Sequence, residues 1–243
     1  MSIVKAIRAV HAGHNIILHG PGGTGKSYAI GKICESVDDI MNIVVVTPTG
    51  ISSVVLNMNA ETSSSKVSTD AKTINREFNI PYLTKDSDLE KIASKSHKKY
   101  KYKSKIDILI IDEISMVSKM MLELLDMLLR KLYNRNKCMG GVQIIMSGDF
   151  YQLSPVKARW CFESDVWAEL NLVVCKYEKS YRNVDDATFE LMKRLRKNQL
   201  TDEDKAVLEE RRLAYENKEY ETLEFKPTIL FPTNRDADSH NLN

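Results

Sequence analysis

The sequence predicts an α/β fold in which a mainly parallel sheet carries helices on both faces. Short apolar runs recur along the chain, and segments long enough for a helix separate them, as in βαβ units. Polar or glycine-rich residues follow several of these runs directly. The four runs predicted as strands are Asn15–His19, Ile43–Thr47, Ile106–Ile111 and Val142–Met146, and Leu172–Lys176 and Thr228–Phe231 are predicted as additional strands.

Length and composition indicate an ordinary globular protein. The chain has 243 residues, of which 43% are apolar and 28% charged, so we expect one complete domain plus part of another. The formal net charge of +2 is too small to identify a polyanion-binding protein by itself. Evidence for such binding must therefore come from local clusters of charge.

Cysteine usage and hydropathy bear on the compartment. The four cysteines show no C-x-x-C pair, which favours reduced thiols; they are Cys34, Cys138, Cys161 and Cys175. The apolar runs are only strand-sized, and the N-terminus lacks the apolar block of a signal peptide. We expect a soluble intracellular protein with no membrane partner.

The loop after the first predicted strand carries the strongest signal. It is followed by a helix-compatible segment and consists of Gly20, Pro21, Gly22, Gly23, Thr24, Gly25, Lys26 and Ser27. A strand, this G-x-x-x-x-G-K-[ST] pattern and a helix are typical of a nucleoside triphosphate site, because small residues let backbone N–H groups surround the phosphates. Lys26 would reach the β- and γ-phosphates, and Ser27 would bind Mg²⁺. A chance glycine turn is the alternative, which the complete pattern disfavours.

Two further strand ends carry residues suited to the same chemistry. Asp112 and Glu113 directly follow the run Ile106–Ile111. Asp112 can hold the Mg²⁺ shell, and Glu113 can activate water. A purely structural role for two buried carboxylates would need partners that the sequence does not show. After the fourth run, Gln152 can sense a γ-phosphate because its amide both donates and accepts hydrogen bonds, although this inference is weak alone.

Two other segments can each be interpreted in two ways. Residues 48–53 form a hydroxyl-rich turn at a strand end, which would line a ligand crevice or simply lead into a helix capped by Ser52. Residues 91–105 read KIASKSHKKYKYKSK. Their lysines could bind phosphates while their tyrosines stack on bases, but we prefer a solvated surface insertion.

In this order, the motifs resemble the first motor domain of a superfamily 1 DNA helicase of the PIF and RecD type. The resemblance covers almost the whole chain and rests on the strings GPGGTGKS, VVVTPTGISS, ILIIDEISMVS and GDFYQLSPV. It implies a RecA-like fold, ATP and Mg²⁺ as cofactors, and single-stranded DNA or a duplex/single-strand junction as partner. It also implies ATP hydrolysis coupled to 5′ to 3′ translocation in a complete protein.

The resemblance also implies individual roles. It assigns phosphate, magnesium and hydrolytic roles to Lys26, Ser27, Asp112, Glu113 and Gln152 as above, and it makes Arg182, in the string SYRN, an arginine finger. The positions that match DNA-gripping segments are Thr47, Thr49, Gly50 and Thr73. One departure is that the register of the family's adenine-binding glutamine falls on Ile3.

The resemblance further implies a division of the chain. Residues 1–178 would form the first motor domain, with a lysine-rich insertion at about 75–105 where relatives carry a strand-separating wedge, and 179–243 would begin an incomplete second motor domain. Translocation needs two such domains that open and close, so we expect a C-terminal continuation or a partner to supply the rest. The alternatives are a truncated, non-motor ATP-dependent DNA-binding or scaffold protein and, less favoured by GDFYQLSPV, a ring-forming ATPase.

Overall fold

The computed structural model describes residues 3–37, 39–54, 71–84, 87–101, 103–181, 185–222, 224 and 227–242. These residues form two compact units, Met1–Asp185 and Asp186–Asn243. The predicted boundary at residue 178 and the assignment of the second part to another motor domain stay predictions. Within the described part of the chain, no helix has the length and apolar character needed to cross a membrane.

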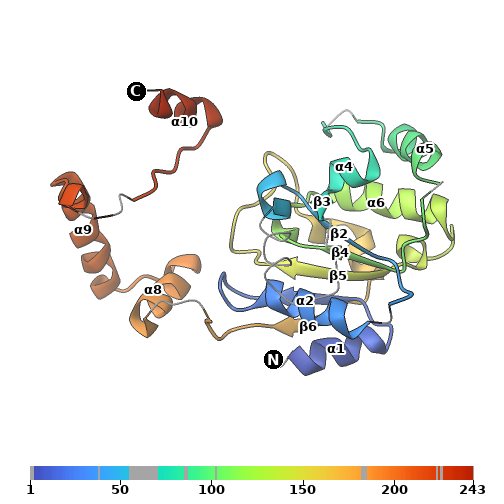
Figure 1. Ribbon diagram of the computed structural model, residues 1–243, viewed down its shortest axis with the longest axis horizontal. Coiled ribbons are helices and arrows are strands. Elements are labelled where there is room, and N and C mark those ends of the chain that lie inside the picture. The colour runs from blue at the N-terminus through green and yellow to red at the C-terminus, as the bar shows by residue number, and fades with distance from the viewer. Residues whose placement is uncertain are drawn as a thin grey trace. The chain divides into compact units, whose positions relative to one another are not determined.

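Unit 1 is built on a six-stranded sheet in the order β3-β2-β4-β5-β1-β6 (Figure 1). Every pairing in it is parallel. The strands are β1 (Ile16–His19), β2 (Ile43–Thr47), β3 (Lys72–Thr73), β4 (Ile108–Ile111), β5 (Gln143–Gly148) and β6 (Val173–Lys176). The predicted α/β class is confirmed, and the sheet brings the C-terminal ends of all these strands to one edge.

Helices cover both faces of this sheet (Figure 1). One face is covered by α1 (Ile3–His11) and α2 (Lys26–Ser36), and the other by α4 (Ile74–Phe78), α5 (Leu89–Tyr100) and α6 (Lys119–Leu132). Strand β4 shows why. Ile108 and Ile110 pack on the face covered by α1 and α2, whereas Leu109 and Ile111 pack on the face covered by α4, α5 and α6. A strand buried on both faces therefore reads as one continuous apolar run.

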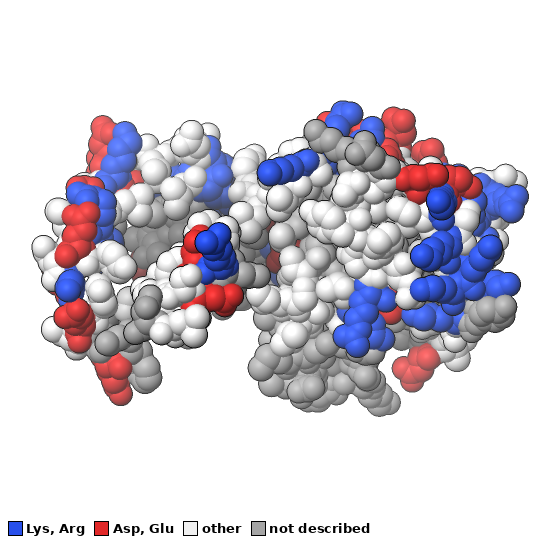
Figure 2. Space-filling model, turned by 90° about the horizontal axis from the view of Figure 1, so that it is seen from above, with Lys and Arg blue, Asp and Glu red and all other residues white. Residues whose placement is uncertain are grey.

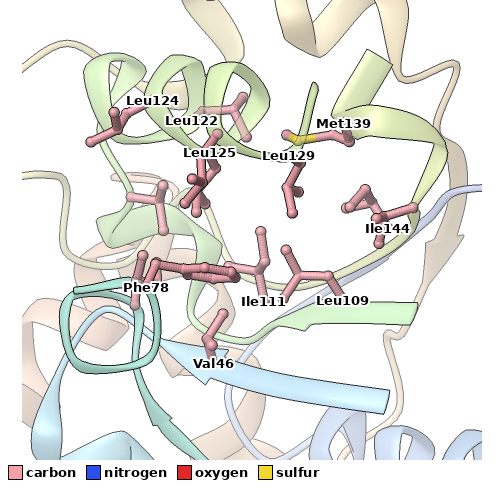
Figure 3. Close-up of a cluster of buried hydrophobic side chains, with 14 of the residues drawn as sticks. Val46, Phe78, Leu109, Ile111, Leu122, Leu124, Leu125, Leu129, Met139 and Ile144 are labelled. Carbon is pink, nitrogen blue, oxygen red and sulfur yellow. The ribbon is translucent and has the colours of Figure 1, made fainter. Parts of the chain in front are cut away.

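The larger core lies under α6. Figure 3 shows Leu122, Leu125 and Leu129 of this helix beside Leu109 and Ile111 of β4. The helix begins after Ser118, whose hydroxyl accepts a hydrogen bond from the Met121 N–H. The leucines of α6 recur at helical spacing, so the helix is amphipathic and buries one side against the sheet. Short elements complete the unit: η1 (Ile114–Met116), η2 (Cys138–Gly141), η3 (Cys161–Glu163) and α7 (Asp165–Glu169).

The lysine-rich segment forms α5, which packs against α6 inside unit 1. Tyr100 is only 2% exposed, and its hydroxyl donates to Glu77 Oε1 at 2.9 Å. Lys103 Nζ donates to the same oxygen at 2.8 Å. The alternative in which this tyrosine stacks on bases is therefore excluded, because its ring belongs to the core, and the preferred surface insertion is likewise too simple, because α5 packs on α6. The second tyrosine of that prediction, Tyr102, lies outside the described residues.

Unit 2 contains α8 (Asp186–Arg196), α9 (Asp202–Glu216), η4 (Glu219–Thr222) and α10 (Asn234–Asn241). Arg194 joins α8 to α9 through two hydrogen bonds of 2.6 Å to the Asp204 carboxylate, which hold the pKa of that carboxyl well below its usual range. The strand predicted at Thr228–Phe231 is wrong, because these residues pair with no strand and Leu230 is 89% exposed.

The end of β1 is held tightly between its neighbours. Tyr177 N–H donates to His19 O at 2.8 Å, and Gly20 N–H donates to Gly148 O at 3.4 Å. A Cβ atom at Gly20 would lie 1.9 Å from the Tyr177 carbonyl oxygen. Only glycine fits at this position, because the obstacle is the backbone of Tyr177.

We expect Gly20→Ala to lower the free energy of unfolding by about 1–3 kcal/mol or more, since the added methyl group must push β1 and β6 apart. The matched control is Gly31→Ala in α2, where an added Cβ meets nothing within 4 Å. That control should be neutral or stabilising by up to about 1 kcal/mol. Urea unfolding of both variants tests this, and equal stabilities would contradict the close approach.

Candidate functional site: a phosphate-binding cavity at the edge of the sheet

The predicted site residues come from three neighbouring strands, β4, β5 and β1. The glycine-rich loop follows β1, Asp112 follows β4, and the turn that carries Gln152 follows β5. Because the strands are parallel, these segments emerge at the same edge of the sheet. The sheet order thus places residues that are far apart in the sequence around one point.

The loop closes on itself through its own carbonyl groups. Lys26 is the first residue of α2, and its ammonium group donates to the Gly20 and Pro21 carbonyl oxygens at 2.8 Å each. The hydroxyl of Thr24, which is 1% exposed, also donates to Pro21 O at 2.8 Å. Gly25 takes the left-handed conformation, with φ +84°, directly before the helix. The N-terminus of α2 is therefore aimed across the loop, as in anion-binding sites.

A cavity of about 430 Å³ opens above this loop. Its lining brings together most of the predicted catalytic and binding residues: Gly22, Gly23, Gly25, Lys26, Ser27, Asp112, Glu113 and Gln152. It is large enough for the phosphates of a nucleotide and surrounds them with an ammonium group, backbone amides, a hydroxyl and two carboxylates. The proximity predicted for these side chains is thus present in the structure.

Asp112 and Glu113 share a partly dry environment. Burial raises the pKa of Asp112, which is 6% exposed, while the Ser147 side chain and the Lys26 charge act in the opposite direction. Burial, followed by the charge of Asp112, raises the pKa of Glu113, and Lys26 again opposes. Glu113 also has the left-handed φ of 53°, which is uncommon for a residue with a side chain and occurs often at functional sites.

Gln152 is placed by a turn that Asp149 holds together. The side chain of Asp149, fully buried at the end of β5, accepts a hydrogen bond from Tyr151 N–H at 3.2 Å. The backbone carbonyl oxygen of Asp149 accepts a hydrogen bond from Gln152 N–H at 2.9 Å. The exposed Gln152 amide then lies close to the loop, since a Cβ added at Gly22 would meet its Nε2 at 3.6 Å.

Two tyrosines of the cavity wall were missed as site residues. Tyr28 follows Ser27 in α2, and Tyr181 N–H donates to the Gly23 carbonyl oxygen at 2.9 Å. Tyr181 is 71% exposed, and a large aromatic side chain at the surface beside a predicted functional arginine is the signal that could have identified it. The next residue, Arg182, which is the predicted finger, lies outside the described residues.

The predicted metal ligands suit a magnesium ion that bridges protein and phosphate. Among the described residues, no group of three or more His, Cys, Asp or Glu side chains could hold a metal ion. Mg²⁺ in nucleotide sites needs only one or two carboxylates besides phosphate oxygens and water. Ser27 and the desolvated Asp112 line the same cavity, so the donors present fit such an ion.

The predicted DNA-contacting residues lie at the ends of β2 and β3. Thr49 and Thr73 are half-buried and Gly50 is exposed, but Thr47 is fully buried, and its hydroxyl donates to Thr49 O at 2.7 Å. A direct DNA contact by Thr47 is therefore wrong for this structure, and its side chain instead shapes the turn. Thr49, rather than Ser52, caps the helical residues after it, by accepting from Ser52 N–H at 3.3 Å.

A second cavity, of about 240 Å³, lies beside this turn. Its lining includes Pro48, Thr49, Asn75, Ser118 and Pro155. We call this the strand-tip cavity. It is the place where the structure offers a surface at the predicted DNA-gripping segments.

Comparison with known proteins supplies the family. The chain is 29% identical to "ATP-dependent DNA helicase PIF1" of Saccharomyces cerevisiae over 208 residues, which are 81% of this chain but 23% of the yeast protein. The human protein of the same name is 28% identical over 204 residues, 81% of this chain and 29% of that protein. The chain therefore spans about a quarter of the length of these relatives.

Solved structures share the fold. The Pif1 helicase of Candida albicans matches with a TM-score of 0.75 and 23% identity, over 100% of this chain and 53% of that one. A Bacteroides Pif1 in complex with ADP-AlF4 matches with a TM-score of 0.71 and 23% identity, over 98% of this chain and 55% of that one. These likenesses confirm the RecA-like architecture. The family model described as "PIF1-like helicase" matches residues 1–212, so the chain belongs to the PIF1-like helicase family.

Proposed function

We propose that this chain is the ATP-hydrolysing motor portion of a DNA helicase, in which hydrolysis is coupled to 5′ to 3′ translocation along single-stranded DNA. The observation that carries the proposal is the cavity in which Lys26, Ser27, Asp112, Glu113 and Gln152 converge from three adjacent strands. Its relatives are named ATP-dependent DNA helicases, which supports the substrate class.

In the proposed site, the loop amides and Lys26 bind the triphosphate. The two carbonyl contacts that Lys26 now makes would give way to phosphate oxygens, which are stronger partners for an ammonium group. Ser27 and Asp112 would hold Mg²⁺, whose charge neutralises the phosphate oxygens during transfer. Gln152 would contact the γ-phosphate across the loop.

Glu113 is the proposed base that takes a proton from the attacking water. A carboxylate with a raised pKa is a better proton acceptor than an ordinary glutamate once it is ionised, and the Lys26 charge favours the ionised form. Arg182 is proposed to stabilise the charge of the transition state as an arginine finger, as the family resemblance implies; its neighbour in the sequence, Tyr181, lines the cavity.

The proposed DNA path crosses the strand-tip cavity at Thr49 and runs past Gly50 and Thr73, each of which is next in sequence to a residue of the cavity lining. Backbone and hydroxyl groups there could contact phosphates without reading bases. Relatives of known structure include a Bacteroides Pif1 bound to single-stranded DNA, which supports a strand as the partner of this chain. Since the chain spans only part of its relatives, we propose that a second motor half, in the same protein or a partner, completes translocation.

Two substitutions separate nucleotide binding from hydrolysis. Lys26→Ala should weaken binding of ATP with Mg²⁺ about 10- to 100-fold, because it removes charge-assisted hydrogen bonds. Glu113→Gln should leave binding nearly unchanged and lower the hydrolysis rate about 100-fold or more. Calorimetry and a phosphate-release assay measure the two effects. Unchanged binding by Lys26→Ala in a folded protein would disprove the site.

A substitution at the strand tips tests the DNA path. A Cβ atom added at Gly50 meets no atom within 4 Å, Gly50 is exposed, and residue 50 starts a helical segment, so Gly50→Glu should fold normally. Its negative charge should weaken binding of single-stranded DNA about tenfold at low salt. Gly50→Gln, of equal size and no charge, is the control. Equal fluorescence anisotropy titrations for both variants would exclude this path, and ATP-tightened binding without DNA-stimulated hydrolysis would favour the non-motor alternative.

A further inference from the structure

A third hollow lies beside α5, apart from the nucleotide cavity. It has a volume of about 490 Å³ and lies between this helix and the turn that follows α4. Its lining includes Lys91, Lys95 and Lys99 on one side and Asn75 and Asn79 on the other. We call it the α5 groove.

The three lysines form a row along the groove. They are four residues apart, so they lie on the same face of α5 with a spacing of about 6 Å along the axis. Another face of the helix holds it in place, because Ala93 and Tyr100 are buried there. Figure 2 shows lysine and arginine side chains gathered at the end of the molecule that carries α5.

The charges in the groove are not neutralised by carboxylates. Lys91, Lys95 and Lys99 are exposed, and no ion pair involves them among the described residues. Nearby carboxylates are engaged elsewhere: Glu90 pairs with Lys131, and Asp88 accepts from the Lys91 backbone N–H as the helix cap.

Glu77 lies closer to the core than Glu90 and Asp88, and its partners are also residues outside the row of three lysines. Lys103 and the Tyr100 hydroxyl contact its Oε1, and Lys72 Nζ lies 3.8 Å from its Oε2. The fold therefore neutralises the cations around Glu77 and leaves a row of three charged ammonium groups in the groove. Such a row attracts a polyanion rather than a single small anion.

The groove adjoins the proposed DNA path through a shared residue. Asn75 lines both the strand-tip cavity and the α5 groove. Its side-chain amide donates to the Ile80 and Pro81 carbonyl oxygens at 3.1 Å each, which fixes the wall between the two hollows. The strand-tip cavity and the α5 groove are therefore neighbours that share a wall at Asn75 and the turn after α4.

We propose that the α5 groove binds the phosphate backbone of the single-stranded DNA that crosses the strand tips, as an extension of the binding path. This proposal rests on the proposed DNA binding by unit 1. Successive lysines are about 6 Å apart along the helix axis, a spacing that suits a chain of phosphates, and no aromatic ring of the described residues lines the groove. The contact is thus with the backbone and is independent of base sequence.

The test compares two triple variants in the full chain. Lys91→Gln/Lys95→Gln/Lys99→Gln removes the row. The control, Lys5→Gln/Arg135→Gln/Lys137→Gln, removes the same charge from exposed side chains on α1 and at the opposite edge of the sheet. Fluorescence anisotropy is measured at several salt concentrations with oligodeoxynucleotides of about 5 and about 20 nucleotides.

We expect the groove variant to bind the longer oligonucleotide about 10- to 100-fold more weakly at low salt than wild type, with a slope of log K against log salt smaller by about 2. The control should change both values much less. With the shorter oligonucleotide, which can remain at the strand tips, the groove variant should be close to the control. ATP binding without DNA should be equal in all three proteins.

Three outcomes would overturn the inference. If the wild type binds the longer oligonucleotide and the two variants weaken it equally, the charges act only through the overall field, and the proposed function stands without this groove. If the loss is the same for both lengths, the lysines are not an extension of the path. If the wild type binds ATP but no DNA, the DNA part of the proposed function fails together with the groove.

Discussion

The packing of β1 between β5 and β6 is the constraint on which the site depends. The strand is bonded on both sides, and at its last residues the neighbouring backbone leaves no room for a Cβ at Gly20. The loop must therefore leave the sheet at one fixed point, directly beside the end of β5 and one strand away from the end of β4. A triphosphate site requires groups held to within fractions of an ångström, and loops alone rarely supply that precision. Here the rigid sheet supplies it.

The electrostatics of the cavity follow from the same geometry. Burial at the strand ends removes water from Asp112 and partly from Glu113, which disfavours their charged forms. The positive charge of Lys26 acts to lower the pKa of both carboxyl groups, while its ammonium group donates hydrogen bonds to loop carbonyl oxygens. Two acids with raised pKa values near one lysine form an arrangement that added positive charge would stabilise. This is the physical reason to expect nucleotide and a divalent cation to bind together.

Much of this arrangement is visible in the sequence because it depends on local pattern. Strand β4 lies buried on both faces, so it appears as an unbroken apolar run that ends in the two acids. Tertiary contacts decided the rest. Tyr100 reads as an exposed aromatic in a lysine-rich segment, but its ring packs against Phe78 at 5.2 Å and its hydroxyl reaches Glu77. The family resemblance assigns a DNA contact to Thr47, the last residue of a predicted strand, but the sheet buries its side chain. The apolar residues near Leu230 read as a strand, but strand formation requires a neighbour with which to pair.

The lysine-rich segment shows why composition could not decide between a solvated insertion and a binding surface. A count of lysines treats Lys103 and Lys95 alike, although the first is bonded to Glu77 and the second has no ion pair in the described structure. Which lysines are paired depends on Glu77, which lies in α4 and outside the lysine-rich segment. By binding Lys103 and the Tyr100 hydroxyl, Glu77 anchors the C-terminal turn of α5 and fixes the rotation of the helix. That rotation is what directs Lys91, Lys95 and Lys99 together into one groove, so a buried acid determines where the exposed positive charge is presented.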